Sequence, residues 1–180
     1  MLKIIRIGHP KLRLKSKPVR KSEIKGKRFQ KFLDDLAQSC LHDNGVGIAA
    51  PQVGVNKRII VVHVDPKNPR YVDKKPFPLT IVINPQISNR SKEKREDWEG
   101  DLSANIRGLV PRSLTCTVVG LDREGNAVRF DLSDDFHARV FQHEYDHLDG
   151  ILFIDKVKNK KSITEFAEWK KYWKNKQAPV

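Results

Sequence analysis

The 180-residue sequence has little cysteine and no long hydrophobic run, and both features narrow the classes of protein it can represent. Its two cysteines, Cys40 and Cys116, are too few for a disulfide framework and too far apart for a close-spaced metal motif. No apolar run approaches the ~20 residues of a transmembrane helix, and the apolar stretch at the N-terminus is too short for a signal peptide. We therefore expect a cytoplasmic protein without membrane association, folded as a single domain over residues 1–180.

Acidic residues are scarce at both ends of the chain. Residues 1–31 contain twelve Lys and Arg against the single acid Glu23, and residues 156–180 contain eight Lys against two Glu. Such ends would attract a polyanion such as ribosomal RNA. No RNA-binding signature accompanies the charge, so a solvated basic surface explains it equally well, and the sequence leaves both interpretations open.

Hydrophobic periodicity predicts an α+β fold, a mostly antiparallel sheet around one buried helix, with an N-terminal and a C-terminal helix besides. Residues 1–28 are basic and interrupted by prolines, which predicts an extended segment. A capping box at Ser162 and Glu165 predicts a basic C-terminal helix over residues 162–176. The remaining expected elements are a helix over 29–41, strands over 59–64, 80–84 (stopped by Pro85) and 93–99, a hairpin of 115–121 with 127–132, and the buried helix from about 133 to 149.

The buried helix carries the pattern His-Glu-x-x-His. His143 and His147 are four residues apart and therefore lie on one helical face, where both imidazoles can bind one metal ion. Glu144 projects beside them, in the position of a residue that handles a proton of water. The apolar neighbours predict that this face points inward, where two His and a Glu need partners. The pattern indicates a metal-dependent hydrolase.

A catalytic metal site of this kind needs a third protein ligand. The other histidines are isolated in the sequence, and we interpret His9, His42, His63 and His137 as surface or structural residues. A carboxylate or a thiolate is then the expected third ligand. The segment over residues 98–103, which combines Trp, Gly and acids between two strands, can supply one.

Three motifs in this order resemble the peptide deformylase family. The first is Gly-Val-Gly-Ile-Ala-Ala-Pro-Gln at residues 45–52, the second is Glu-Gly-Asp-Leu-Ser at 99–103, and the third is Gln-His-Glu-Tyr-Asp-His at 142–147. Residues 8–13, 110–112 and 146–150 are also similar to family segments, so the resemblance covers roughly residues 4–155. It implies hydrolysis of the N-formyl group from newly made chains that begin with formyl-methionine.

The resemblance also implies a metal site with one departure from the family. The family's metal-binding cysteine is replaced by Asp101, and the loop that follows differs from the family's pattern and looks about one residue short. The implied ligands are therefore His143, His147 and Asp101, with Glu144 as the general acid and base. A His-His-carboxylate set still binds Zn²⁺ and also suits Fe²⁺ and Mn²⁺. We expect one divalent ion, Fe²⁺ or Zn²⁺ first, with Ni²⁺, Co²⁺ or Mn²⁺ as alternatives.

Further residues receive roles by the same resemblance. The side-chain amide of Gln52 and the backbone N–H of Leu102 would stabilise the oxyanion. Gly45, Gly47 and Gly100 would let the backbone approach the peptide, and Ile48 would line the pocket for the methionine side chain. These ten site residues are expected to work in a monomer.

Two other functions stay open at this point. Asp101 and the altered loop also fit a deformylase-like paralogue that holds N-terminal peptides or sits on the ribosome without turnover. The same loop change fits a hydrolase of a different N-acyl group. Formate release from a formyl peptide would distinguish the first function from both alternatives.

Overall fold

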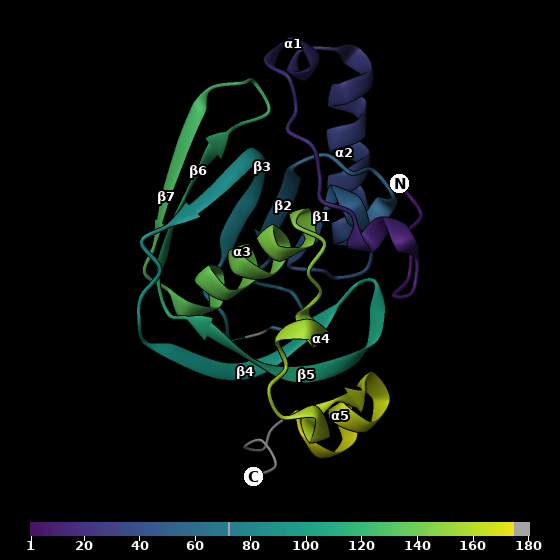
Figure 1. Ribbon diagram of the computed structural model, residues 1–180, viewed down its shortest axis with the longest axis vertical. Coiled ribbons are helices and arrows are strands. Elements are labelled where there is room, and N and C mark those ends of the chain that lie inside the picture. Colours follow the sequence, from purple (N-terminus) through teal and green to yellow (C-terminus); the bar gives the residue numbers. More distant parts are fainter. Residues whose placement is uncertain (72, 175–180) are drawn as a thin grey trace.

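The computed structural model describes residues 1–71 and 73–174, in which one central helix contacts two antiparallel sheets (Figure 1). The larger sheet has the strand order β1-β2-β3-β6-β7, and the smaller has the order β4-β5-β8. The central helix is α3 (Asp135–Leu148). The α+β class is therefore confirmed. The strands are β1 (Gly47–Ala49), β2 (Ile59–Val64), β3 (Phe77–Ser88), β4 (Lys94–Asp101), β5 (Ala104–Ser113), β6 (Cys116–Leu121), β7 (Ala127–Leu132) and β8 (Thr164–Glu165).

Both faces of the larger sheet are covered, and β2 shows how. Ile60 and Val62 point to the face that packs against α3, whereas Ile59 and Val61 point to the opposite face. That opposite face packs against helix α2 (Lys27–His42), which extends the expected helix over 29–41 by a residue or two at each end. Since successive side chains of a strand alternate between faces, a strand buried on both sides reads as a continuous apolar run.

The N-terminal segment is less extended than the sequence predicts. A 3₁₀ helix η1 (Pro10–Arg13) and a short helix α1 (Lys21–Ile24) interrupt it before α2 begins. The fixed φ of Pro10 suits the first helical position, and the His9 ring accepts a hydrogen bond from the Lys11 backbone N–H. Leu12 and Ile24 are buried and anchor the two short helices. The prediction of an extended segment was wrong for these residues.

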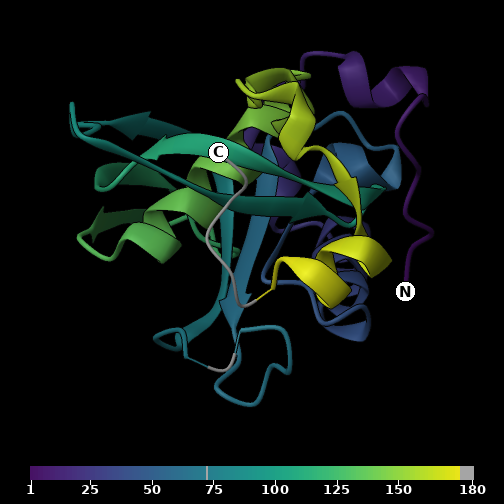
Figure 2. The same ribbon diagram turned by 90° about the horizontal axis from the view of Figure 1, so that it is seen from below.

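The C-terminal helix is shorter than the predicted 162–176. Thr164 and Glu165 form strand β8 on β5, and helix α5 covers only Phe166–Tyr172 (Figure 2). The predicted capping box does not form because the Ser162 hydroxyl accepts a hydrogen bond from the Leu109 backbone N–H and donates one to Asn159. Ser162 instead ends the 3₁₀ helix η3 (Lys160–Ser162). Residues 175 and 176 lie outside the described residues.

Strand β3 passes through Pro85 instead of stopping there. The register between β3 and β6 shifts between Ile83 and Gln86, and Asn84 adopts a positive φ of 52°. Pro85, which has no N–H to donate, therefore lies at an irregularity of the ladder, one of the few places where a sheet accepts proline.

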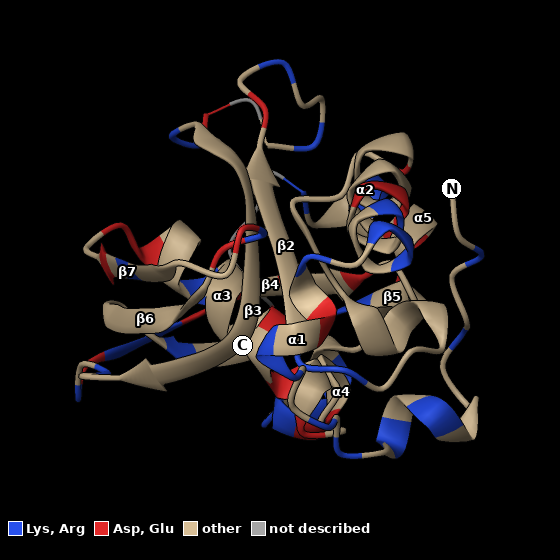
Figure 3. Cartoon of the chain, turned by 90° about the horizontal axis from the view of Figure 1, so that it is seen from above, with Lys and Arg blue, Asp and Glu red and all other residues tan. Residues whose placement is uncertain are grey.

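Basic residues, blue in Figure 3, recur along the N-terminal segment. Several of them are paired, as are Arg13 with Asp155 and Arg20 with Glu23. None of the helices in the described ranges combines the length and the apolar character of a membrane span. The remaining short elements are the 3₁₀ helix η2 (Ala50–Val53) and helix α4 (Phe153–Lys156).

Candidate metal centre and active-site pocket

Helix α3 presents the two histidines on its inner face. The Asp134 carboxylate begins the helix by accepting hydrogen bonds from the backbone N–H groups of Phe136 and His137. His143 and His147 follow one turn apart, and their ring centroids are 5.0 Å from each other. Only 8% of His143 and 1% of His147 is exposed, so both are held inside the protein as the sequence predicts.

Asp101 completes a three-residue cluster with this pair. Its Oδ2 lies 3.2 Å from His147 Nε2 and 4.0 Å from His143 Nε2, and one ligand atom from each residue lies within 4.8 Å of the others. A tight turn between β4 and β5 places Asp101, whose Oδ1 accepts a 2.7 Å hydrogen bond from the Ser103 backbone N–H. An Asp that bonds the backbone two residues later is typical of such turns.

The hydrogen-bond pattern around the cluster leaves imidazole nitrogens available to bind a cation. Both ring nitrogens of His147 are buried and lack a hydrogen-bond partner among the described residues. His143 Nδ1 lies 3.0 Å from Glu99 Oε2, which leaves Nε2 directed at Asp101. Metal-binding histidines are usually oriented in this way through the second nitrogen. Two imidazole nitrogens and a carboxylate oxygen therefore converge as a donor set for a divalent metal ion.

Glu99 belongs to a buried charge network that the sequence did not predict. Arg112 donates to both of its carboxylate oxygens at 2.8 and 2.9 Å, and Arg139 donates to Oε1 at 2.8 Å. Although burial opposes ionisation, Arg112 and His143 hold the pKa of Glu99 far below its usual range. Arg139 could have indicated this network from the sequence, because it is a charged residue one turn before His143 on the predicted inner face of the helix.

Glu144 lies beside the cluster and is buried, with 4% of it exposed. Its Oε2 is buried without a hydrogen-bond partner in the described part of the chain. Burial, opposed by His143 and reinforced by the Asp101 and Glu99 carboxylates, raises the pKa of Glu144 to about 8. A cation held by the cluster would lower this pKa again, toward the ionised form that a general base needs. Gly47 makes room for it, since a Cβ at Gly47 would lie 2.5 Å from Glu144 Oε1.

Gln52 and Leu102 border the cluster on the other side. The Gln52 amide donates a 2.8 Å hydrogen bond to Asp101 Oδ1, so it contacts a prospective metal ligand directly. Leu102 lies in the turn after Asp101, where its carbonyl accepts a hydrogen bond from Arg6. Both residues line the same pocket as Asp101 and Glu144.

The four residues expected to bind substrate separate into two groups. Gly45, Gly47 and Gly100 line the pocket, whereas Ile48 does not. Ile48 is fully buried and packs with the α2 side of the sheet, because side chains alternate along β1 and Gly47 takes the position that faces Glu144. The structure therefore does not place Ile48 in a side-chain pocket for substrate.

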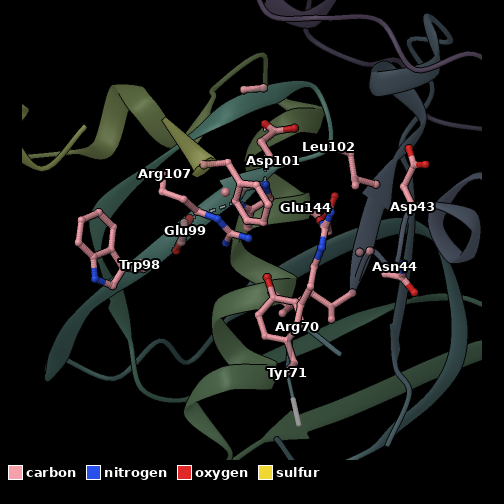
Figure 4. Close-up of a pocket in the computed structure, with 18 of the residues that line it drawn as sticks. Asp43, Asn44, Arg70, Tyr71, Trp98, Glu99, Asp101, Leu102, Arg107 and Glu144 are labelled. Carbon is pink, nitrogen blue, oxygen red and sulfur yellow. Dashed lines mark hydrogen bonds and ion pairs between the residues drawn. The ribbon is translucent and has the colours of Figure 1, made fainter. Parts of the chain in front are cut away.

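The pocket has a volume of about 440 Å³, within the range of small-ligand sites. Figure 4 shows many of the side chains that line it. Val46, Phe136 and Val140 supply apolar lining near the histidines. The sequence did not predict a second group of lining residues, which come from the segment between β2 and β3, from β5 and from α5, namely Arg70, Tyr71, Arg107 and Phe166. No local motif marks them, since they meet only through the tertiary fold.

Comparisons with known proteins find relatives that match most of the chain. A family model described as polypeptide deformylase matches residues 1–162. Peptide deformylase 2 of Nostoc sp. is 47% identical over 167 residues, which cover 92% of this chain and 91% of that protein. Peptide deformylase of Leptospira biflexa is 40% identical over 161 residues, covering 88% and 89%.

Solved structures similar to this one are also described as peptide deformylases. The Met-Ala-Ser-bound class I type b peptide deformylase of Acinetobacter baumannii superposes with a TM-score of 0.83 at 37% identity, covering 87% of this chain and 98% of that one. A probable peptide deformylase from Synechococcus phage S-SSM7 gives 0.74 at 36% identity, covering 87% and 99%.

Proposed function

The chain belongs to the polypeptide deformylase family, and from this premise we propose which residues remove the N-formyl group from formyl-methionyl peptides. In this hydrolysis the oxygen of water adds to the formyl carbon, and the bond from that carbon to the peptide nitrogen breaks. Formate and a free amine are released. The observation that carries the proposal is the convergence of Asp101, His143 and His147 beside the buried Glu144.

Asp101, His143 and His147 would hold one divalent metal ion. Such an ion supplies a Lewis acid and lowers the pKa of water at the site. Asp101 would bind through Oδ2, because its Oδ1 already accepts hydrogen bonds from Gln52 and Ser103. Glu99 would keep the His143 ring oriented through Nδ1.

Glu144 would move the proton. It takes a proton from the attacking water and delivers it to the leaving amine. Its Oε2 has no partner among the described residues, so this oxygen can accept that proton without breaking an existing hydrogen bond. Leu102 would donate its backbone N–H to the oxyanion that develops on the formyl oxygen. Gln52 Nε2 donates to Asp101 and also lies 3.5 Å from Ser103 Oγ, and its second amide hydrogen would turn from that weak contact to the oxyanion.

The peptide main chain would lie between two strand edges. β1 is one edge of the larger sheet and β4 is one edge of the smaller, and residues of both strands line the pocket. Gly45, Gly47 and Gly100 border the pocket from these two sides. An extended peptide can add to such edges through its backbone. Ile48 would act only by packing β1 onto the sheet.

The finer assignments belong to the same proposal. A carboxylate ligand is harder than a thiolate, so we infer Fe²⁺ or Zn²⁺, with Ni²⁺, Co²⁺ and Mn²⁺ as alternatives. We further propose a monomer in the cytoplasm, with one deformylase-like domain over residues 1–180. The basic ends would contact ribosomal RNA near emerging chains.

The test combines metal content with turnover in one sample. The protein is purified without oxygen, its bound metal is quantified, and formate release from formyl-Met-Ala-Ser is measured. Glu144→Gln is the matched variant, because it keeps the size of the side chain but cannot carry the proton. We expect about one metal ion per chain in both proteins, and a turnover that falls by roughly 10²–10⁴-fold in the variant.

Other outcomes would overturn the proposal in distinct ways. Bound metal without formate release from the unchanged protein would move the function to a different acyl group or to peptide binding. No bound metal after reconstitution with Fe²⁺, Zn²⁺, Ni²⁺ or Co²⁺ would remove the catalytic function. Undiminished turnover in the Glu144 variant would exclude Glu144 as the proton carrier.

A further inference from the structure

Arg107 is a buried cation on the pocket wall. It lies on β5 directly opposite Gly100 of β4, and only 6% of it is exposed. Its guanidinium crosses over Gly100, since a Cβ at Gly100 would lie 2.6 Å from Arg107 Nε. The absence of a side chain at Gly100 is therefore what allows Arg107 to reach the pocket. Gly100 precedes Asp101, so the guanidinium lies close to the prospective metal ligands.

Aromatic rings fix this guanidinium in place. Its central carbon lies 4.8 Å from the Trp169 ring centroid and 5.2 Å from that of Phe166. The two rings are stacked on each other with centroids 5.9 Å apart. Cation–π contacts of this kind hold the charge but leave the N–H groups of the guanidinium free to donate. Arg107 is thus oriented before any ligand arrives.

Arg107 has no hydrogen-bond acceptor or ion-pair partner for its side chain within residues 1–71 and 73–174. The other two buried arginines near the pocket differ, because Arg112 and Arg139 both donate to Glu99. A buried guanidinium without acceptors is costly unless something else supplies them. The N–H groups of Arg107 that face the pocket are therefore available to a ligand.

Arg70 adds a second guanidinium at the same place. It lies 5.4 Å from the Phe166 ring centroid, and Figure 4 shows the side chains of Arg70 and Arg107 both entering the pocket. Within the described residues the Arg70 side chain also has no acidic partner. Three acids of the pocket are engaged elsewhere. Asp43 contacts His42, Glu99 contacts two arginines, and Asp101 contacts Gln52 and His147. The fourth acid, Glu144, has an unpartnered oxygen but forms no ion pair with Arg70 or Arg107 among the described residues.

We propose that Arg107 and Arg70 form a carboxylate-binding subsite for the substrate peptide. This inference rests on the proposed function and names a preferred substrate class, formyl-methionyl peptides with a carboxylate in their second or third residue. An extended peptide advances roughly 3.3 Å per residue. A peptide that follows the β4 edge from Asp101 past Gly100 therefore brings its second or third residue close to Arg107. Lys is the commoner basic residue of the chain, yet all four Lys or Arg residues that line the pocket are Arg. The planar guanidinium is the group that binds carboxylates through two parallel hydrogen bonds.

Matched peptides test the inference. The rate constant kcat/KM for formate release is measured for formyl-Met-Ala-Ser amide and for analogues with Asp or Asn at the second or third residue. We expect the Asp peptide to exceed its Asn analogue by about 10-fold or more at one of the two positions, mainly through KM. A free C-terminal carboxylate in place of the amide distinguishes an α-carboxylate from an acidic side chain as the bound group.

Arginine variants assign the preference to residues. Arg107→Gln should remove most of the Asp-over-Asn ratio, and Arg70→Gln should reduce it. Arg28→Gln changes the net charge equally on the exposed first turn of α2 and should keep the ratio. Arg107→Lys keeps the positive charge and should retain part of the Asp-over-Asn ratio. This variant keeps the test decisive if Arg107→Gln fails to fold.

The failures of the two proposals are distinguishable. Equal rates for Asp and Asn peptides would overturn the carboxylate subsite while leaving deformylation intact, and so would a preference that survives both Gln variants. If no formyl peptide releases formate, the proposed function fails instead. The subsite is then decided by calorimetric binding of Met-Asp-Ala amide against Met-Asn-Ala amide, where equal affinities would overturn it.

Discussion

The Gln52 side chain is fixed at both ends, and one of those ends is Asp101. Its Nε2 donates to Asp101 Oδ1 at 2.8 Å, and its Oε1 accepts from the Ala49 backbone N–H at 2.7 Å. Only 1% of Gln52 is exposed. An amide held in this way orients the carboxylate, so Gln52 would support metal binding in addition to any role in stabilising the oxyanion.

Gln52→Leu should therefore weaken metal binding. We expect the dissociation constant for Zn²⁺ to rise by about 10–100-fold, because Asp101 loses a hydrogen bond that holds its second oxygen. Competition with a chelator measures this constant directly. Gln86→Leu, on an exposed position of β3, is the control and should leave it unchanged. A lower kcat with unaltered metal affinity would show that Gln52 acts on the substrate alone.

The sequence predicted the metal cluster because helical spacing has a direct spatial meaning. Residues four apart on α3 must share a face, so His143 and His147 could be paired before the fold was known. The isolation of the other histidines directed attention to the acids of residues 98–103, and the family motif then singled out Asp101. The position of Ile48 differs from the expected one for an equally local reason, since alternation along β1 gives the pocket face to Gly47 and turns Ile48 toward α2.

The parts that could not be predicted depend on register between distant segments. Arg107 reaches the pocket because it pairs with Gly100, and it is oriented by Phe166 and Trp169 from a helix about sixty residues later. No spacing rule encodes such a meeting. The Ser162 capping box failed for the same reason, because the backbone N–H of Leu109 uses the hydroxyl that the predicted cap required.

Glu99→Ala should be strongly destabilising. The substitution leaves Arg112 and Arg139 buried without their shared carboxylate and removes the partner of His143 Nδ1. Breaking a buried ion pair from one side costs about 3–5 kcal/mol in the free energy of unfolding. Urea unfolding of the metal-free proteins measures this loss. Glu96→Ala, at an exposed position of the same strand, should cost less than about 0.5 kcal/mol. A loss below about 1 kcal/mol for Glu99→Ala would mean that the arginines find other acceptors.

Glu23→Gln should lower the stability of the protein in a pH-dependent way. Hydrogen bonds from Lys57 and Arg20 lower the pKa of Glu23 from 4.5 to about 2. A carboxyl whose pKa is lower in the folded state adds stability above its unfolded pKa, and this stability is lost as pH falls through the folded value. The melting temperature of the variant should therefore lie roughly 1–3 °C below that of the unchanged protein at pH 7, the range for one surface ion pair.

The difference in melting temperature between the Glu23→Gln variant and the unchanged protein should shrink between pH 4.5 and 2. In this range the Glu23 carboxylate of the unchanged protein also becomes protonated and loses its charge. Melting followed by circular dichroism across this range measures it. Glu93→Gln is the matched control, since Glu93 is exposed and its side chain forms no ion pair within the described residues. A difference that persisted unchanged to pH 2 would mean that Glu23 stabilises the fold through packing and not through its charge.

Asp101→Cys should separate the two tasks that this carboxylate performs. Asp101 directs Oδ2 at the histidines while Oδ1 accepts hydrogen bonds from Gln52 and Ser103, and a cysteine has only one sulfur atom for all of these partners. A thiolate that binds metal would release the Gln52 amide toward the substrate and favour softer ions. We expect kcat/KM for a formyl peptide to rise by about 10-fold, together with tighter Zn²⁺ binding. Asp101→Ala removes the metal-binding side chain altogether and should lose the metal, so it serves as the control. Unchanged kcat/KM in the Cys variant, with metal bound, would mean that Asp101 does not limit the rate and that the carboxylate serves this site as well as a thiolate would.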